Sequence, residues 1–264
     1  MDTTFDNVIR LDDHRPRPFV QVPVKVASTG SRPFLCRASD GKNYWCKQLN
    51  NAHGREAVIN EIVASSIGAR IGAPVRPWAI LDVPSDFAGT PVGEGRDRYR
   101  LDDLPVFGSV DLHEADIEYD AFAIDRDGNY DRFPRLAALW LLCNAEDIQL
   151  LYDYTEDMTV WSVDHGLWFG SRELPWQFGD VTELAGQTIL PEMRTPIAET
   201  HWERAIVGVD ALSIDILDDI EDAIPDEWNV KSSDLGRLVR YAISRKHFAT
   251  EKLRELQRNH ARRR

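Results

Sequence analysis

The sequence has 264 residues, of which 43% are hydrophobic and 28% charged, as in globular proteins with one large domain or two modest ones. Its formal net charge is −13, from 31 basic and 44 acidic residues. This balance argues against a nucleic-acid-binding surface, which needs cations to replace phosphate counterions. No apolar run reaches the roughly 18 residues that span a bilayer, and the acidic N-terminus lacks the apolar stretch of a secretory signal. We therefore expect a cytoplasmic protein without a nucleic-acid or membrane partner.

The N-terminal part of the chain has the pattern of a small β-sheet. Residues 1–17 are polar and predict a flexible leader. Alternating valines predict a half-buried strand over Phe19–Ala27, followed by a turn at Ser28–Ser31. Asp40-Gly41 lies between two strand-like runs, Phe34–Ala38 and Asn43–Leu49, which indicates a hairpin.

If Asp40 and Gly41 are the central turn residues of this hairpin, Phe34 lies opposite Lys47 and Cys36 lies opposite Trp45. Cys36 and Cys46 then point to opposite faces, which disfavours a disulfide between them. Together with Cys143 they are expected to be reduced thiols in the core.

One helix and more strands complete the first half of the chain. The helix is predicted over Arg55–Ile71, where Gly72 and Pro74 end it. A strand follows at Pro77–Val83, then a loop over Pro84–Arg100. Leu104–Leu112 fits either a further strand or a linker, and we place the boundary between two lobes there, with 18–107 as the first lobe and 108–264 as the second.

The second half is predicted to be mostly helical. Pro134 fits the first turn of a helix over Arg135–Cys143, because that turn needs no donor at the proline position. Leu150–Tyr154 and Thr159–Val163 form a second hairpin. Further helices are predicted at Pro196–Val207, Ser213–Ile224, Ser233–Phe248 and Thr250–Arg262. The last of these is basic, and we expect it to lie against the acidic segment Asp210–Glu227 rather than to bind RNA or a membrane.

Four features follow one another in the order that a phosphoryl-transfer site requires. Gly30, followed by Ser31, lies in a turn that can expose amides to phosphates. Lys47 lies in an otherwise apolar strand pattern, where a lysine calls for a partner. Glu61 lies mid-helix on a small, largely apolar face, so the two side chains are expected to pair. Asp164 follows an apolar strand, where an acid can hold Mg²⁺.

The cluster Asn144–Gln149 lies upstream of Asp164, across the second hairpin, and offers a candidate base and a neutral oxygen ligand. Each of these features also has a purely structural explanation. Gly30 fits an ordinary hairpin turn, and Asp164 fits an ordinary β-turn. It is the combination of Lys47 with Glu61 that favours a functional site.

The order of these motifs resembles the short HipA-like kinases of bacteria, which are distant relatives of phosphatidylinositol kinases and protein kinases. The resemblance covers roughly residues 20–170. It rests on the strand with Lys47, on Asn60-Glu61 in a helix that ends at Gly72-Ala73-Pro74-Val75, on Phe107-Gly108-Ser109 and on Val163-Asp164-His165-Gly166.

The resemblance implies an α+β, two-lobed, protein-kinase-like fold with ATP in the cleft. A small antiparallel sheet with one helix would form the first lobe, and a larger helical lobe with one hairpin the second. Lys47 would bind the phosphates together with the turn at Gly30 and Ser31, Glu61 would support Lys47, and Asp164 would hold Mg²⁺ with Gln149.

The catalytic loop departs from the family pattern, which has an aspartate and then an asparagine five residues later. If Gln149 stands at the asparagine position, the base position holds Asn144, which cannot accept a proton as a carboxylate does. If Asp147 is the base, the loop is shortened. Trp45 is a second departure, at a position where kinases carry a small or aliphatic residue over the adenine.

Three functions are therefore left open. The first is an ATP- and Mg²⁺-dependent phosphotransferase that acts on a protein or small-molecule acceptor. The second is a catalytically silent, kinase-shaped regulatory module, to which Asn144 and Trp45 point. The third is a toxin or antitoxin partner that acts through the acidic helical segment.

Overall fold

The computed structural model describes residues 16–170, 176 and 188–263. Most of the predicted leader, residues 1–15, lies outside this range. The strands are β1 Val20–Val26, β2 Phe34–Ala38, β3 Asn43–Lys47, β4 Trp78–Leu81, β5 Pro91–Val92, β6 Tyr99–Arg100, β7 Val106–Val110, β8 Ala115–Glu118, β9 Gln149–Asp153 and β10 Thr159–Val163. The α-helices are α1 Arg55–Ile71, α2 Asn129–Leu142, α3 Glu199–Ala211, α4 Ile216–Ala223, α5 Ser232–Ser244 and α6 Lys246–Ala261, and short 3-10 helices occupy Gly95–Asp97 (η1), Tyr154–Glu156 (η2) and Asp226–Trp228 (η4).

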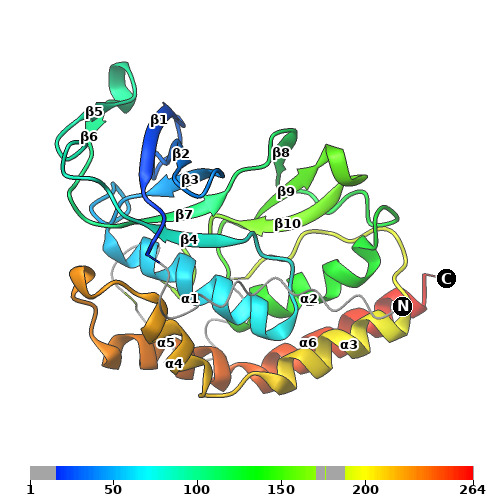
Figure 1. The fold of residues 1–264 in the computed structure, drawn as a ribbon. Coiled ribbons are helices and arrows are strands. Elements are labelled where there is room, and N and C mark those ends of the chain that lie inside the picture. Colours follow the sequence, from blue (N-terminus) through cyan, green and yellow to red (C-terminus); the bar gives the residue numbers. More distant parts are fainter. Residues whose placement is uncertain (1–15, 171–175, 177–187, 264) are drawn as a thin grey trace.

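A five-stranded antiparallel sheet forms the N-terminal part of the molecule, in the order β1-β2-β3-β7-β4. The segment that the sequence left open as strand or linker is β7, which pairs with both β3 and β4. Helix α1 lies below this sheet and separates it from the other helices (Figure 1). The lobe boundary at residues 107 and 108 stays a prediction, and β7 runs through it.

Helix α1 has the predicted bounds and is buried on nearly all sides, since it packs on the sheet and on the helical layer at once. Val58 and Ile62 belong to the core under the sheet, whereas Val63 and Ile67 belong to the helical core. Gly72 ends the helix with a left-handed φ of 73°. The amide of Ala73 then donates to the carbonyl of Gly68 at 2.8 Å, a closure that glycine favours at this position.

The register of the first hairpin differs from the prediction by one residue. Phe34 pairs with Cys46, and Cys36 pairs with Tyr44. The loop has three residues rather than two, because Gly41 adopts a φ of 81° and the amide of Ala38 bonds to the carbonyl of Lys42, as in a type I turn with a bulge. The shift places Cys36 and Cys46 on the same face, with their sulfurs 3.5 Å apart as free, buried thiols. The prediction that they point to opposite faces was wrong.

Strand β1 forms as predicted, but its alternating burial does not. The pairing with β2 shifts between Val20 and Val22 and again between Pro23 and Lys25. Each shift changes which face the following side chains occupy. Val20 is therefore buried, whereas Val22 and Val24 are exposed.

The second sheet has three strands, in the order β10-β9-β8. The predicted hairpin corresponds to β9 and β10, and the edge strand β8 was not predicted. Val75, just after α1, forms a bridge with Ser162 of β10 and so connects the two parts of the molecule.

Helix α2 begins before the predicted start, so Pro134 is its sixth residue and not part of the first turn. The side-chain amide of Asn129 anchors the true start, since it donates to the carbonyls of Ala123 and Met158 at 2.8 Å each. These partners lie 6 and 29 residues away in the sequence. The local pattern that predicts a helix therefore does not reveal them.

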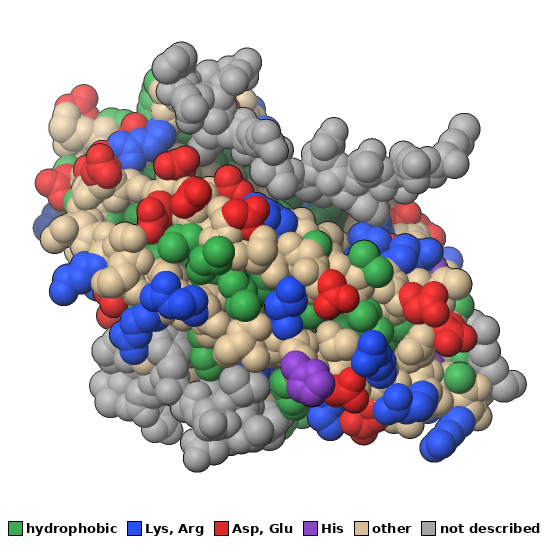
Figure 2. All heavy atoms as spheres, turned by 90° about the horizontal axis from the view of Figure 1, so that it is seen from below, with side chains coloured by type: hydrophobic (Ala, Val, Ile, Leu, Met, Phe, Trp, Pro, Cys, Tyr) green, Lys and Arg blue, Asp and Glu red, His purple; other side chains and the backbone are tan. Residues whose placement is uncertain are grey.

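The remaining helices form a layer below α1 and α2 (Figure 1). The basic helix α6 packs against α2 and α3, and the acidic helix α4 is paired instead with Arg70 of α1, which contacts Asp215 and Asp219. The first residue of α6, Lys246, donates to the backbone carbonyls of Asp210 and Leu212 at 2.9 and 3.0 Å, so the expectation that α6 lies against the acidic segment is confirmed where this segment begins. Seen from below, basic and acidic side chains are interspersed on this face (Figure 2). Within the described residues no helix has the length and apolarity that a membrane span requires.

Candidate functional site

Lys47 lies at the end of β3, where its ammonium reaches two carboxylates from distant parts of the chain. It forms the predicted ion pair with Glu61 of α1, and it donates to Oδ1 of Asp164 at 2.6 Å, directly after β10. The Lys47 side chain is only 10% exposed, and that of Asp164 is 30% exposed. The structure thus brings together one cation and two anions that are up to 117 residues apart.

The charges in this cluster hold one another in the ionised state. Burial lowers the pKa of Lys47, but the carboxylates of Asp164 and Glu61 outweigh it, so its pKa lies above the ordinary value. Burial raises the pKa of Asp164, and the neighbouring Lys47 outweighs that effect and lowers it. Both groups are therefore charged at neutral pH.

Glu61 is oriented by the segment that follows Asp164. The backbone amide of His165 donates to Oε2 of Glu61 at 3.1 Å, and the imidazole Nδ1 lies 3.4 Å from the same oxygen. The other ring nitrogen lies 3.1 Å from Oγ of Ser162. Because burial lowers the pKa of His165, the imidazole is neutral and acts as a hydrogen-bonding spacer rather than a further cation.

Asn60 fixes the same segment from the neighbouring position of α1. Its side-chain amide donates to the carbonyls of Gly166 at 2.8 Å and Trp168 at 3.1 Å, and its oxygen accepts from Nε1 of Trp176. Two consecutive residues of α1, Asn60 and Glu61, therefore hold the chain on the C-terminal side of Asp164.

Gln149 and Asp147 stand next to Asp164. Gln149 is the first residue of β9 and pairs with Val163. Its side chain therefore lies beside Asp164, which follows Val163. Its amide nitrogen lies 3.2 Å from Oδ2 of Asp164 and 3.2 Å from Oδ2 of Asp147. The exposed Asp147 is thus connected to the Lys47 cluster through Gln149.

Asn144, the other candidate from this loop, is fully buried. Its Oδ1 accepts a hydrogen bond from the hydroxyl of Thr188 at 3.1 Å. The side chain of Asn144 is therefore closed off from solvent.

The backbone is in the left-handed region at three of these positions. The φ angles are 48° at Asn144, 53° at Asp147 and 57° at Asp164. Asparagine and aspartate tolerate this region better than other residues with a Cβ. Such conformations persist where the surrounding structure enforces them, which is frequent at functional sites.

The predicted turn at Gly30 and Ser31 is confirmed and is covered by a histidine that the sequence did not indicate. A Cβ at Gly30 would collide with the imidazole of His53, and the charge of His53 contributes to lowering the pKa of Asp164. Ser31 is buried, and its hydroxyl has no hydrogen-bond partner in the described part of the chain. The imidazole of His53 thus packs closely on the backbone of the turn at Gly30.

Trp45, two residues before Lys47, is held toward the segment after β7. Its Nε1 donates to Oδ1 of Asp111 at 2.7 Å, and the ammonium of Lys25 lies 5.3 Å from the ring centre. Between these contacts the indole is half-buried.

Three residues of this site were not assigned such contacts from the sequence: His165, Asn60 and His53. Asn60 and His165 are direct sequence neighbours of the predicted residues Glu61 and Asp164. A polar side chain beside a buried charge is the signal that could have identified them. His53 carries no signal of its own, because its approach to Gly30 depends on the loop before α1.

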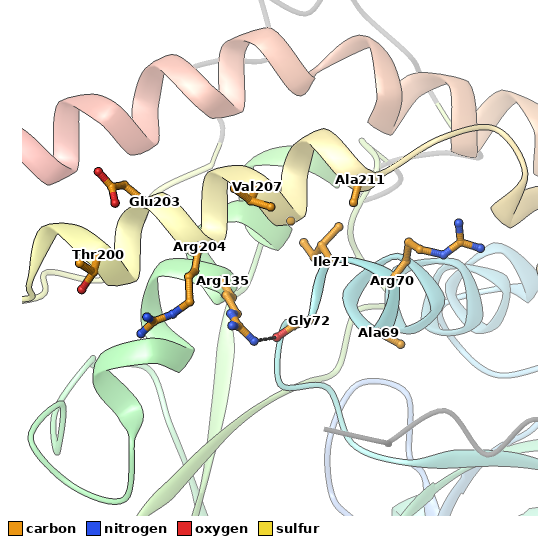
Figure 3. Close-up of a pocket in the computed structure, with 11 residues that line it drawn as sticks. Ala69, Arg70, Ile71, Gly72, Arg135, Thr200, Glu203, Arg204, Val207 and Ala211 are labelled. Carbon is orange, nitrogen blue, oxygen red and sulfur yellow. Dashed lines mark hydrogen bonds between the residues drawn. The ribbon is translucent and has the colours of Figure 1, made fainter. Parts of the chain in front are cut away.

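A separate groove of about 680 Å³ lies between the end of α1 and α3. Figure 3 shows Arg135 of α2 crossing it, with one guanidinium nitrogen donating to the carbonyl of Gly72. The groove contains none of the Lys47 cluster, so it is distinct from the candidate site.

Sequence comparison relates the N-terminal part of the chain to one family. Residues 19–123 match the model of the HipA-like kinases. This range contains Lys47 and Glu61 but ends before Asp147 and Asp164. No protein with a curated description matches the chain significantly.

A solved kinase structure has a similar fold. The proinflammatory kinase CtkA of Helicobacter pylori superposes with a TM-score of 0.53 at 11% identity, over 90% of this chain and 96% of that one. A Golgi casein kinase gives a TM-score of 0.48 at 9% identity, over 90% and 76% of the two chains. The predicted resemblance is thus confirmed: the chain has a protein-kinase-like α+β fold, and residues 19–123 carry the sequence pattern of the HipA-like kinases.

Proposed function

We propose that the protein is an ATP- and Mg²⁺-dependent phosphotransferase. The observation that carries this proposal is the position of the Lys47 ammonium between Glu61 of α1 and Asp164 after β10. Phosphoryl transfer depends mainly on positioning and charge stabilisation, and this arrangement offers a cation for phosphate oxygens beside an acid for a metal ion.

In this proposal Lys47 binds the nucleotide phosphates, and Glu61 keeps its ammonium in place. His165 and Asn60 hold Glu61 and the Asp164 segment in register, as their hydrogen bonds indicate. The turn at Gly30 and Ser31 offers backbone amides and a buried hydroxyl that lacks a partner among the described residues, which suits contact with phosphate oxygens.

The donors around Asp164 fit a magnesium ion. Mg²⁺ prefers oxygen ligands and is usually bound by one or two carboxylates together with substrate phosphates. Asp164 supplies a partly exposed carboxylate, and the amide of Gln149, turned about its last torsion angle, presents its oxygen to the same place. A bound metal ion would neutralise charge on the transferred phosphoryl group.

Asp147 suits the role of base better than Asn144. It is exposed, it is ionisable, and it contacts Gln149, whereas Asn144 is buried and engaged with Thr188. We assign Asp147 to orient the acceptor and to take its proton.

Transfer of the γ-phosphate from labelled ATP tests the proposal. Asp164→Asn should reduce labelling of the protein or of an added acceptor by at least about a hundredfold, because the metal loses its carboxylate. Asp157→Asn is the matched control, since Asp157 is an exposed aspartate on the same hairpin with a left-handed φ of 47°. Equal labelling in the wild type and in Asp164→Asn would contradict the proposal.

A catalytically silent module is the second candidate, and the buried Asn144 at the expected base position favours it. Such a protein would bind ATP, with or without Mg²⁺, and transfer no label to any acceptor. Nucleotide-dependent thermal shift without labelling is the result that would establish it.

A further inference from the structure

Strand β8 is an outer strand of the three-stranded sheet. It pairs with β9 on one side, from Ala115 opposite Asp153 to Glu118 opposite Leu150. No strand within residues 16–170, 176 and 188–263 pairs with its other side. In Figure 1 β8 stands at the upper rim of the molecule, at the outer end of the three-stranded sheet. An open edge presents backbone donors and acceptors to which an extended segment of another chain can add.

The side chains of β8 are apolar on the face that leads to the candidate site. Ile117 is 50% exposed and lies opposite Leu151, which in turn lies opposite Trp161. Gln149 lies two residues from Leu151 on the same strand, and it therefore shares this face. Tyr119, directly after β8, is 61% exposed. The apolar side chains on this face thus form a row from beside Gln149 to the outer edge of β8, namely Trp161, Leu151, Ile117 and Tyr119.

The other side chains of β8 and its flanks are acidic. From Asp111 to Asp125 the chain has six acidic residues and no lysine or arginine. Asp116 is exposed and accepts a hydrogen bond from the hydroxyl of Tyr154 at 2.9 Å, and Glu118 follows it on the same face. A segment that pairs with this edge must be basic at alternate positions and apolar at the others.

We propose that β8 is the docking edge for a basic, extended segment of a protein substrate, which adds as a fourth strand beside it. Docking itself needs no catalysis, but its role as substrate recognition rests on the proposed function. If the pairing of β8 with β9 continues beyond Glu118, Tyr119 lies opposite Gln149. Neighbouring strands are about 4.8 Å apart. An added strand would then lie on the order of 10 Å from the backbone of Gln149. A serine or threonine just beyond the docked segment would approach Asp147 from this side.

The acidic side chains also admit a protective explanation, since charges on an edge strand prevent association. The exposed Ile117 and Tyr119 argue against this explanation, because apolar side chains on the same edge promote the association that the charges would prevent. A nucleic acid is disfavoured by the negative charge of the strand.

Peptide binding tests the proposal without any catalytic readout. The probe is a fluorescein-labelled octapeptide of alternating lysine and valine followed by serine, measured by anisotropy. Asp116→Lys combined with Glu118→Lys should weaken its binding by about tenfold or more, since two attractions become repulsions. The matched control is Asp218→Lys combined with Asp222→Lys on α4, two exposed acids one helical turn apart, and it should bind like the wild type.

Two further measurements separate strand addition from general charge attraction. The same peptide with N-methyl groups on alternate amides should bind at least about tenfold more weakly, because it cannot complete the ladder. Ile117→Thr, which keeps a β-branched residue, should weaken binding severalfold and serves if the charge variant fails to fold.

Equal losses in the β8 and α4 variants, unchanged binding of the N-methylated peptide, or no binding of the basic peptide to the wild type would overturn the proposal. Specific binding without transfer of phosphate to the serine would leave the docking edge in place and count against the phosphotransferase.

Discussion

His165 connects the buried carboxylate of Glu61 to the strand that ends before Asp164. Its amide and ring face Glu61, and its second nitrogen lies beside Ser162. Of the charged groups around it, Lys47 disfavours protonation, whereas Glu61 and Asp164 favour it. Burial is the largest effect and lowers the pKa, so the folded protein holds this imidazole neutral.

Acidification should therefore destabilise the fold through His165. An ordinary histidine has a pKa of about 6.5 in an unfolded chain, and the folded value lies below it, so the unfolded state binds more protons in between. The stabilising contribution is complete above about pH 6.5 and is lost as the pH falls toward the folded pKa. Urea unfolding between pH 7.5 and 5.5 should show a shallower loss for His165→Asn than for the wild type.

The difference between the wild type and His165→Asn reports on the titration of His165. His260 also has a pKa lowered by burial, but it titrates equally in both proteins. The pKa of Asp164 is lowered below its ordinary range, so this carboxylate stays ionised throughout the window. Equal slopes in the two proteins would show that His165 does not titrate as described.

At this scale the sequence predicted the charged residues but not the neutral residues that hold them. Lys47 and Glu61 are recognisable because a charge in an apolar pattern needs a partner. Asn60 and His165 act across more than a hundred residues of chain, and no local pattern records such a contact.

Helix α3 crosses the end of α1 at close range. A Cβ at Gly208 would lie 2.5 Å from the backbone oxygen of Ile71, an atom that cannot move without shifting α1. A Cβ at Gly236 in α5 would meet only the guanidinium of Arg240, at 3.0 Å, which is the end of a flexible side chain.

Gly208→Ala should lower the free energy of unfolding by about 1–3 kcal/mol, because the backbones must separate. Gly236→Ala, with the same change of residue, should leave stability unchanged or raise it by up to about 1 kcal/mol through helix propensity. Urea titrations of the two variants measure the difference. A loss for Gly236→Ala as large as that for Gly208→Ala would contradict this packing.

Elements with strong local signals were predictable, and those that depend on pairing were not. Helix α1 has a glycine and then a proline just after its last turn, and its predicted bounds are confirmed. Strand β8 has four residues within an acidic segment, so its sequence resembles a loop. The bulges of β1 and the three-residue turn after β2 shift the registers by one residue, which an alternating pattern does not reveal.

Trp228 links the C-terminal part of the molecule to the core under the first sheet. It is buried with Ile62 of α1 and Phe107 of β7, and its Nε1 donates to the carbonyl of Pro105 at 2.9 Å. Arg55, at the start of α1, donates to the carbonyl of Trp228 in return. The chain segment after α4 thus belongs to the core between α1 and strands β4 and β7 of the first sheet.

Trp228→Ala should lower the free energy of unfolding by about 3–5 kcal/mol, as expected for loss of a buried tryptophan. Trp228→Phe keeps much of the apolar area and loses the hydrogen bond, so the loss should be nearer 1 kcal/mol. Chemical unfolding measures both. A loss below about 1 kcal/mol for the alanine variant would mean that the two parts are not joined through this residue.

In the proposed function, Lys47 and Asp164 act together on a nucleotide and its metal ion. Calorimetric titration of ATP, with Mg²⁺ and with a chelator, tests this most directly in the wild type, in Lys47→Ala and in the control Asp157→Asn. We expect Mg²⁺ to strengthen binding to the wild type and the control, and Lys47→Ala to weaken it by at least about tenfold, as for the loss of a buried charged contact. If Lys47→Ala binds ATP with the same affinity as the wild type, both with Mg²⁺ and without it, the assignment of this site is contradicted.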